Sequence, residues 1–252
     1  MIPENIQQRE DYIFNQVLNG LFDARWIDVT KESAGRKLRL RVMEDALQVD
    51  GVRVNVTAVL AQKLADTFDA SLPTPMVADM MFAAAERRAV PCPVSISSST
   101  ASMIKHSQSV DKQLTGQPKT GLVATCGKHW VLDKQLETKP SKACNYGWHF
   151  KGSSFQGIKG FPPASQDTGP NVRVIQPNAT AHDALHVDYS QVCQLVSQVC
   201  FVDDVEIRFS DLVKDPSLAS LVSHQGPLKI DRQPGTKPHT GNIVLLPVYI
   251  TI

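Results

Sequence analysis

The amino-acid sequence predicts an α+β fold with a mostly antiparallel sheet, an N-terminal helix, an early pair of helices and long loops rich in Pro, Ser and Gly. Three observations lead to this prediction: an Asp-Gly dipeptide flanked by alternating residues, two closely spaced helical patterns, and a proline-rich section over 90–177. We expect residues 37–252 to form a single α+β domain and residues 1–36 to form a helical or extended appendage.

The first elements follow from local signals. Residues 3–18 are predicted to be a helix, because a proline lies near the start and a glycine just beyond the end. Apolar and basic residues then alternate over 38–42, which is typical of a strand. The segment 47–56 alternates on both sides of its central Asp-Gly, and this predicts a hairpin with a type I′ turn.

Two helices are predicted next. Apolar residues recur at helical spacing over 59–68, directly after Thr57, which is a suitable N-cap. A second helix is expected over 76–88, because Thr74 and a proline after it occupy the N-cap and the first helical position.

The rest of the chain is expected to combine long surface loops over 90–177 with short strands. A helix is considered over 211–222, although a proline inside it could break it. Residues 242–252 are predicted to form a closing strand at a sheet edge, because Pro247 cannot donate to a ladder. The short strands are expected at 120–125, 130–132, 192–200 and 205–209.

Composition narrows the classes of function. The chain of 252 residues has 26 Lys and Arg against 25 Asp and Glu, so its formal charge is +1. That balance argues against a protein that wraps nucleic acid. No stretch is apolar enough to span a membrane, and no secretion signal is recognised at the start, so we expect a protein that is cytoplasmic as synthesised. The five cysteines form no CxxC pair, and we expect reduced, mostly buried thiols.

Histidine and aspartate gather in the segment 182–190. A helix would place His182 and His186 on one face, and a strand would place Asp188 and Ser190 beside them. Two imidazoles and a carboxylate suit zinc or iron, with His149 as a distant further ligand. The alternative is an exposed polar loop whose histidines bind nothing.

Three further candidates could take part in catalysis. Lys128 follows a glycine and could act as a base or stabilise charge if it is desolvated. Tyr189 could share the stabilisation of an oxyanion. Ser190 could be the nucleophile of a Ser-His-Asp arrangement, although no GxSxG turn surrounds it. Ordinary packing or exposure is the alternative for each.

A resemblance brings several of these residues together. The run 146–149 (YGWH), the later 175–177 (IQP), His182 and the run 188–190 (DYS) resemble a family of uncharacterised bacterial proteins with YGWH, IQP and H…DYSHG-type motifs. The similarity extends over roughly 45–200. Many members look secreted, so we expect a cell-envelope role such as peptidoglycan processing.

This chain departs from the family pattern at two positions. Gln191 replaces the histidine that follows the serine, and His186 stands at a tyrosine-like position. Glutamine neither ligates zinc as imidazole does nor shuttles a proton.

Two functions are therefore considered. The first is a metal-dependent hydrolase that cleaves a peptide or amide bond of an envelope polymer. His149, His182 and either His186 or Asp188 would hold zinc or iron, and a metal-bound water would attack. The second is a catalytically inactive assembly protein, plausibly of a phage virion, which pairs with its own copies or other particle proteins through the strand 242–252. A third hypothesis is a carbohydrate-binding module that uses Trp130, Trp148 and Tyr146 as stacking platforms.

Overall fold

The computed structural model describes residues 1–33, 35–95, 97–152, 166–169 and 171–248. Its helices are α1 (Ile6–Leu18), α2 (Ala58–Thr67), α3 (Pro75–Ala84), α4 (Thr100–Leu114) and α5 (Phe209–Leu212), with short 3-10 helices at Lys134–Thr138 and Ala219–Leu221. Its strands are β1 (Trp26–Ser33), β2 (Arg36–Met43), β3 (Gln48–Val49), β4 (Val52–Arg53), β5 (Ala70–Ser71), β6 (Arg87–Arg88), β7 (Val123–Ala124), β8 (Lys128–Val131), β9 (Cys144–Lys151), β10 (Gln166–Gly169), β11 (Val172–Ala179), β12 (Gln191–Val192), β13 (Val196–Val202) and β14 (Val205–Arg208).

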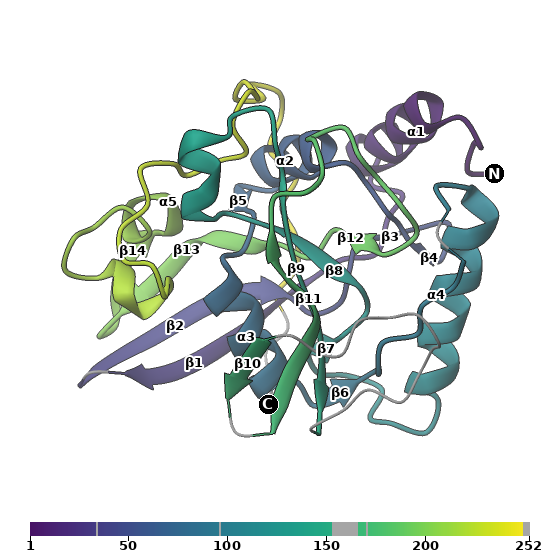
Figure 1. Cartoon of the computed structure of the whole chain (residues 1–252). Coiled ribbons are helices and arrows are strands. Elements are labelled where there is room, and N and C mark those ends of the chain that lie inside the picture. The colour runs from purple at the N-terminus through teal and green to yellow at the C-terminus, as the bar shows by residue number, and fades with distance from the viewer. Residues whose placement is uncertain (34, 96, 153–165, 170, 249–252) are drawn as a thin grey trace.

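Two sheets of five strands form the frame of the molecule. One has the order β1-β2-β13-β14, with β5 also paired to β13, and the other has the order β10-β11-β9-β8-β12 (Figure 1). Within the described ranges, every pairing between two strands is antiparallel except β8 with β12 and β6 with β7. The predicted α+β class, with an N-terminal helix and a mostly antiparallel sheet, is confirmed.

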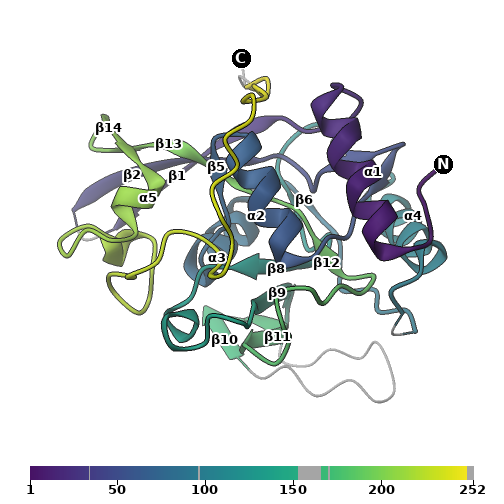
Figure 2. The same ribbon diagram turned by 90° about the horizontal axis from the view of Figure 1, so that it is seen from above.

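The N-terminal residues share the main core. Ile13 and Val17 of α1 and Trp26 of β1 are buried in the same apolar cluster as α2 and β13. All eight residues of β1 pair with β2. Because β2 belongs almost entirely to the segment 37–252, this pairing joins the N-terminal segment to the rest of the chain. The helix α1 lies beside α4 (Figure 2). The guanidinium of Arg9 donates to the backbone oxygen of Ser98, which shortly precedes α4. The segment 1–36 is thus packed into the body of the fold.

The strongest local signals are confirmed. Asp50 and Gly51 both have positive φ, 52° and 71°, as a type I′ turn requires. The side chain of Thr57 caps α2 by accepting from the backbone of Leu60, and Thr74 caps α3 in the same way. The helix α3 ends at Ala84, four residues earlier than predicted.

The prediction of loops over 90–177 is wrong in its most regular part. The helix α4 occupies fifteen residues there, and Ser99 caps it by accepting from the backbone of Ser102. Its buried face includes His106 and Ser107 among apolar residues, and these polar side chains hide the helical period. The strands β9 and β11 also run for eight residues each.

The C-terminal predictions are only partly met. The proposed helix over 211–222 is a short α5 followed by a 3-10 turn, with Pro216 between them. The predicted strand over 242–252 makes a single bridge in its described part, where Val248 pairs in parallel with Trp26. The backbone N–H of Trp26 donates to the oxygen of Pro247, so this segment is held against the chain's own β1.

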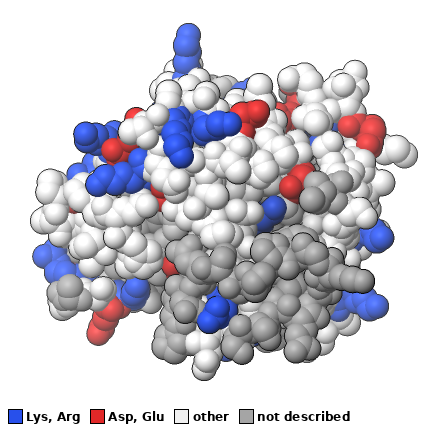
Figure 3. Space-filling model, in the orientation of Figure 1, with Lys and Arg blue, Asp and Glu red and all other residues white. Residues whose placement is uncertain are grey.

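The surface carries charge of both signs. On the face drawn in Figure 3, basic and acidic side chains are interspersed among uncharged ones. Among the described helices, none combines the length and the apolar character that a membrane crossing requires.

Candidate functional site

The YGWH motif lies in the middle of β9, where the backbone departs from a regular strand. Gly147 has φ +120° and Trp148 has φ +61°. In a regular strand, residues 146 and 149 would face opposite sides of the sheet. The two left-handed residues break that alternation, so the hydroxyl of Tyr146 and the ring of His149 both bond to Asp79. Left-handed backbone at a bulky residue is costly, and such strain is characteristic of functional sites.

Glycine is required at position 147. Side chains rarely adopt a φ of +120°, and a Cβ at this position would lie 3.2 Å from Cδ2 of His129. His129 is the partner of Tyr146 in the β8–β9 ladder, so neither strand can move away freely. Burial, with a contribution from His149, lowers the pKa of His129 to about 3. Its ring is therefore neutral and packs without a counter-charge.

Lys128 and Asp188 form a buried ion pair beside this kink. The Lys128 Nζ lies 3.7 Å from Asp188 Oδ2 and 5.6 Å from the centre of the Trp148 ring. Each of the paired side chains is only 11% exposed. The same carboxylate oxygen lies 3.7 Å from Nε2 of His186, whose side chain is 33% exposed. Burial lowers the pKa of Lys128 more than the nearby Asp188 raises it.

The carboxylate of Asp188 is held in place by its neighbours in the loop. Its Oδ1 accepts from the backbone N–H of Ser190 at 2.8 Å and from the Ser190 hydroxyl at 2.5 Å. Gln191 accepts the backbone N–H of Asp188 through its side-chain oxygen. Burial alone would raise the pKa of Asp188, but Lys128 and the Ser190 donors outweigh it and lower the pKa. Asp188 is therefore ionised at neutral pH.

The serine is poorly placed to act as a nucleophile. Ser190 is fully buried, and its hydroxyl donates to the Asp188 carboxylate rather than to a histidine. Its role in the site is to orient the carboxylate.

The aromatic residues of the motif are core residues. Tyr189 packs against His106 and Trp148, with ring centres 5.4 and 6.2 Å away. Burial, with a smaller contribution from Asp188, raises the pKa of Tyr189 to about 12, so its hydroxyl keeps its proton. Trp148, Trp130 and Tyr146 are each at most 2% exposed, so they are not the stacking platforms of a carbohydrate-binding module.

His182 and His186 are stacked on each other, and both are partly exposed. Their ring centres are 3.8 Å apart and their planes differ by 9°. His182 also contacts the edge of Trp130. Burial and, after it, the neighbouring His186 lower the pKa of His182, so that ring is neutral at neutral pH. These residues lie on a loop, rather than on the helix or strand considered from the sequence.

The expected metal ligands are not brought together. His149 bonds to Asp79 in another cluster, while His182, His186 and Asp188 lie near Lys128. In a stacked pair of imidazoles the lone pairs lie in two parallel planes and do not converge on one ion. In the part of the chain that is described, no three His, Cys, Asp or Glu side chains are arranged to hold a metal ion. These residues do not fit zinc or iron in this arrangement.

A second cluster surrounds Asp79 of α3. Its Oδ1 accepts from the Tyr146 hydroxyl at 2.6 Å and from Nε2 of His149 at 2.7 Å. Its Oδ2 lies 3.2 Å from Nε2 of His224. Phe82, one turn further along α3, stacks on the ring of His149. An ionised carboxylate only accepts hydrogen bonds, so the tautomer of His149 with its proton on Nε2 is the one that fits an ionised Asp79.

Asp79 and His224 are not among the site residues that the sequence predicts. Asp79 is the only charged residue in the otherwise apolar α3, and a lone carboxylate on a buried helix must find polar partners. That signal was present in the sequence. His224 lies in a loop 145 positions away along the chain, and no local pattern connects it to Asp79.

No family model matches this chain, and neither a curated protein nor a solved structure is significantly similar to it. The chemistry of the site therefore rests on the geometry of its own residues.

Proposed function

We propose that this protein is a hydrolase-like enzyme whose acid–base centre consists of Lys128, Asp188 and His186. The observation that carries the proposal is the shared oxygen: Asp188 Oδ2 lies 3.7 Å from both the Lys128 Nζ and His186 Nε2. A desolvated lysine, an ionised carboxylate and a partly exposed imidazole within one site are the groups that acid–base catalysis requires.

Each of the three groups has a separate role in hydrolysis. His186 accepts a proton from a water molecule, whose oxygen attacks the carbonyl carbon of an amide. Asp188 stabilises the imidazolium that forms, as a buried carboxylate does in other catalytic arrangements. The Lys128 ammonium stabilises the negative charge that develops on the carbonyl oxygen. His186 then returns the proton to the leaving amine as the carbon–nitrogen bond breaks.

The remaining expected residues act by positioning. Ser190 and Gln191 orient Asp188 through the bonds at its side chain and its backbone N–H. Tyr189 supports Trp148, over which Lys128 lies. None of these three needs to touch the substrate.

The favoured substrate class is a peptide or amide bond of a cell-envelope polymer. The support for it is the resemblance of the YGWH, IQP and DYS segments to a family whose members look secreted. The residues that carry this resemblance include Asp188 itself.

Incubation with purified peptidoglycan tests the proposal. The wild-type chain is expected to release new primary amines, detected by a fluorogenic amine reagent and identified by mass spectrometry. Lys128→Met and His186→Gln should each lower the rate about 100-fold or more. Lys119→Met is the matched control, because Lys119 is exposed. Equal rates in all four proteins would contradict the assignment.

An assembly function is the second candidate, and the C-terminal segment supports it. Ile243 and Leu245 are 56% and 86% exposed, which is unusual for large apolar side chains close together. A partner subunit in a particle would cover them. Light scattering after size-exclusion chromatography tests this, and a chain that stays monomeric at high concentration would contradict it.

A further inference from the structure

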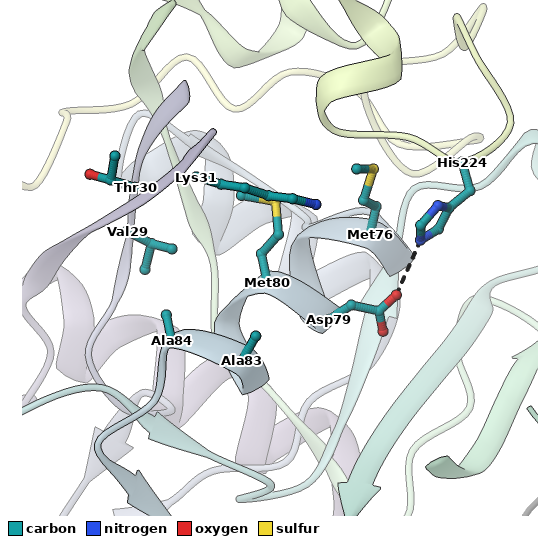
Figure 4. A pocket seen from close by; sticks show the side chains of 9 residues that line it. All are labelled: Val29, Thr30, Lys31, Met76, Asp79, Met80, Ala83, Ala84 and His224. Carbon is teal, nitrogen blue, oxygen red and sulfur yellow. Dashed lines mark hydrogen bonds and ion pairs between the residues drawn. The ribbon is translucent and has the colours of Figure 1, made fainter. Parts of the chain in front are cut away.

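A cleft of about 400 Å³ lies between β1 and α3, with Asp79 and His224 at one side of it (Figure 4). Nine residues line it, and none of them belongs to the Lys128 site. The cleft is large enough for a small organic ligand.

Most of its wall is apolar. Five of the nine lining residues have no polar side-chain atom that could bind water: Val29, Met76, Met80, Ala83 and Ala84. Methionine side chains adapt to ligands of varied shape because they are unbranched and polarisable. An exposed apolar hollow of this kind gains free energy when a hydrocarbon chain covers it.

The polar groups of the cleft leave one charge unmatched. In Figure 4 the Lys31 side chain extends over Met80 into the cleft, and no ion pair with it is found among the described residues. The negative charge of Asp79 is already engaged, since both its oxygens have partners. His224 is held by one ring nitrogen to Asp79, and its side chain is 61% exposed. The groups at the rim that can still bind a ligand are therefore the Lys31 ammonium and the second ring nitrogen of His224.

We propose that this cleft is a binding site for a small amphipathic carboxylate. The hydrocarbon part of the ligand covers the two methionines and the alanines of α3, and its carboxylate pairs with the Lys31 ammonium beside His224. This site goes beyond the proposed hydrolase, because it uses neither Lys128 nor Asp188.

Isothermal titration of the full chain with octanoate tests the proposal. Octanoate should bind saturably, and Lys31→Met should weaken its binding about fivefold, which corresponds to the loss of one exposed charge pair. Lys119→Met should leave the affinity unchanged, because it removes an equivalent charge elsewhere on the surface. Octylamine, which has the same chain and the opposite charge, should bind more weakly than octanoate.

A second variant tests the apolar wall. Ala83 is exposed at the cleft, so Ala83→Phe should fill the hollow and abolish octanoate binding without loss of stability. Ala101→Phe, which changes an exposed alanine on α4, is the control and should bind as the wild type does. The proposal is overturned if octanoate does not bind, if octylamine binds equally well, or if Lys31→Met and Ala83→Phe bind like their controls.

Discussion

Two carboxylates flank the kink in β9, and they are bound in different ways. Asp79 accepts directly from Tyr146 and His149 at 2.6 and 2.7 Å, and its other oxygen contacts His224 at 3.2 Å. Asp188 is fixed through one oxygen only, while the other lies 3.7 Å from both the Lys128 Nζ and His186 Nε2.

This difference in bonding predicts different roles for the two carboxylates. The short bonds at Asp79 form a closed network that ties α3 to β9, as a stabilising polar cluster does. The contacts of Asp188 Oδ2 are longer than a hydrogen bond, so this oxygen is held less firmly than those of Asp79. We therefore expect substitutions near Asp79 to act on stability and substitutions near Asp188 to act on chemistry.

The largest expected effect on stability is at the kink that both clusters share. Gly147→Ala should lower the free energy of unfolding by about 3 kcal/mol, because it adds backbone strain and a contact with His129. Gly152→Ala is the matched control, since Gly152 has a similar φ of +112° but no atom of the described residues within 4 Å of a Cβ. It should cost only about 1–2 kcal/mol of backbone strain. Urea denaturation measures both, and equal losses would show that the contact with His129 is unimportant.

A smaller loss is expected when Asp79 is changed. Asp79→Asn keeps the shape of the side chain, but it removes the negative charge and one of the two acceptor oxygens that Tyr146, His149 and His224 contact. The free energy of unfolding should fall by about 2 kcal/mol. Glu206→Gln, a neutralisation on the exposed surface of β14, should change it little. An unchanged stability in Asp79→Asn would show that the network does not support the fold.

Ser190 separates positioning from nucleophilic catalysis. Ser190→Ala removes one hydrogen bond to Asp188, so it should cost about 1 kcal/mol and leave most of the hydrolytic rate in place. A nucleophile cannot be removed with so little effect. Loss of all hydrolysis in a folded Ser190→Ala protein would reinstate the serine as the attacking group.

The smallest expected effect is a change in the pH dependence of stability. The pKa of Lys128 is lowered in the folded protein, so the unfolded chain binds more protons at pH values between that pKa and the ordinary lysine value of 10.5. The wild type should therefore become more stable relative to Lys128→Met as the pH rises through this window. Urea denaturation from neutral pH upward measures the difference. A constant difference would mean that the lysine is not desolvated.

Local signals in the sequence were sufficient for part of the fold. The caps at Thr57 and Thr74 and the Asp-Gly turn depend only on neighbouring residues, so they were predicted correctly. The helix α4 was missed because His106 and Ser107 occupy its buried face in place of apolar residues.

The site was harder to predict than the fold. The segment 182–190 was recognised from its composition, and the structure does bring Lys128, His186 and Asp188 together. His149 was assigned to the wrong neighbours, because the kink at Gly147 and Trp148 turns it toward Asp79. A kink of this kind depends on packing against β8. The residue pattern along a single strand therefore does not predict it.

The most direct test of the account is the rate at which peptidoglycan releases amines in the presence of the wild type, Lys128→Met and Asp79→Asn. If the Lys128 site performs the chemistry, the wild type and folded Asp79→Asn should both release amines, and Lys128→Met should be slower by about 100-fold or more. Activity that persists in Lys128→Met, or no release by the wild type, would contradict the account.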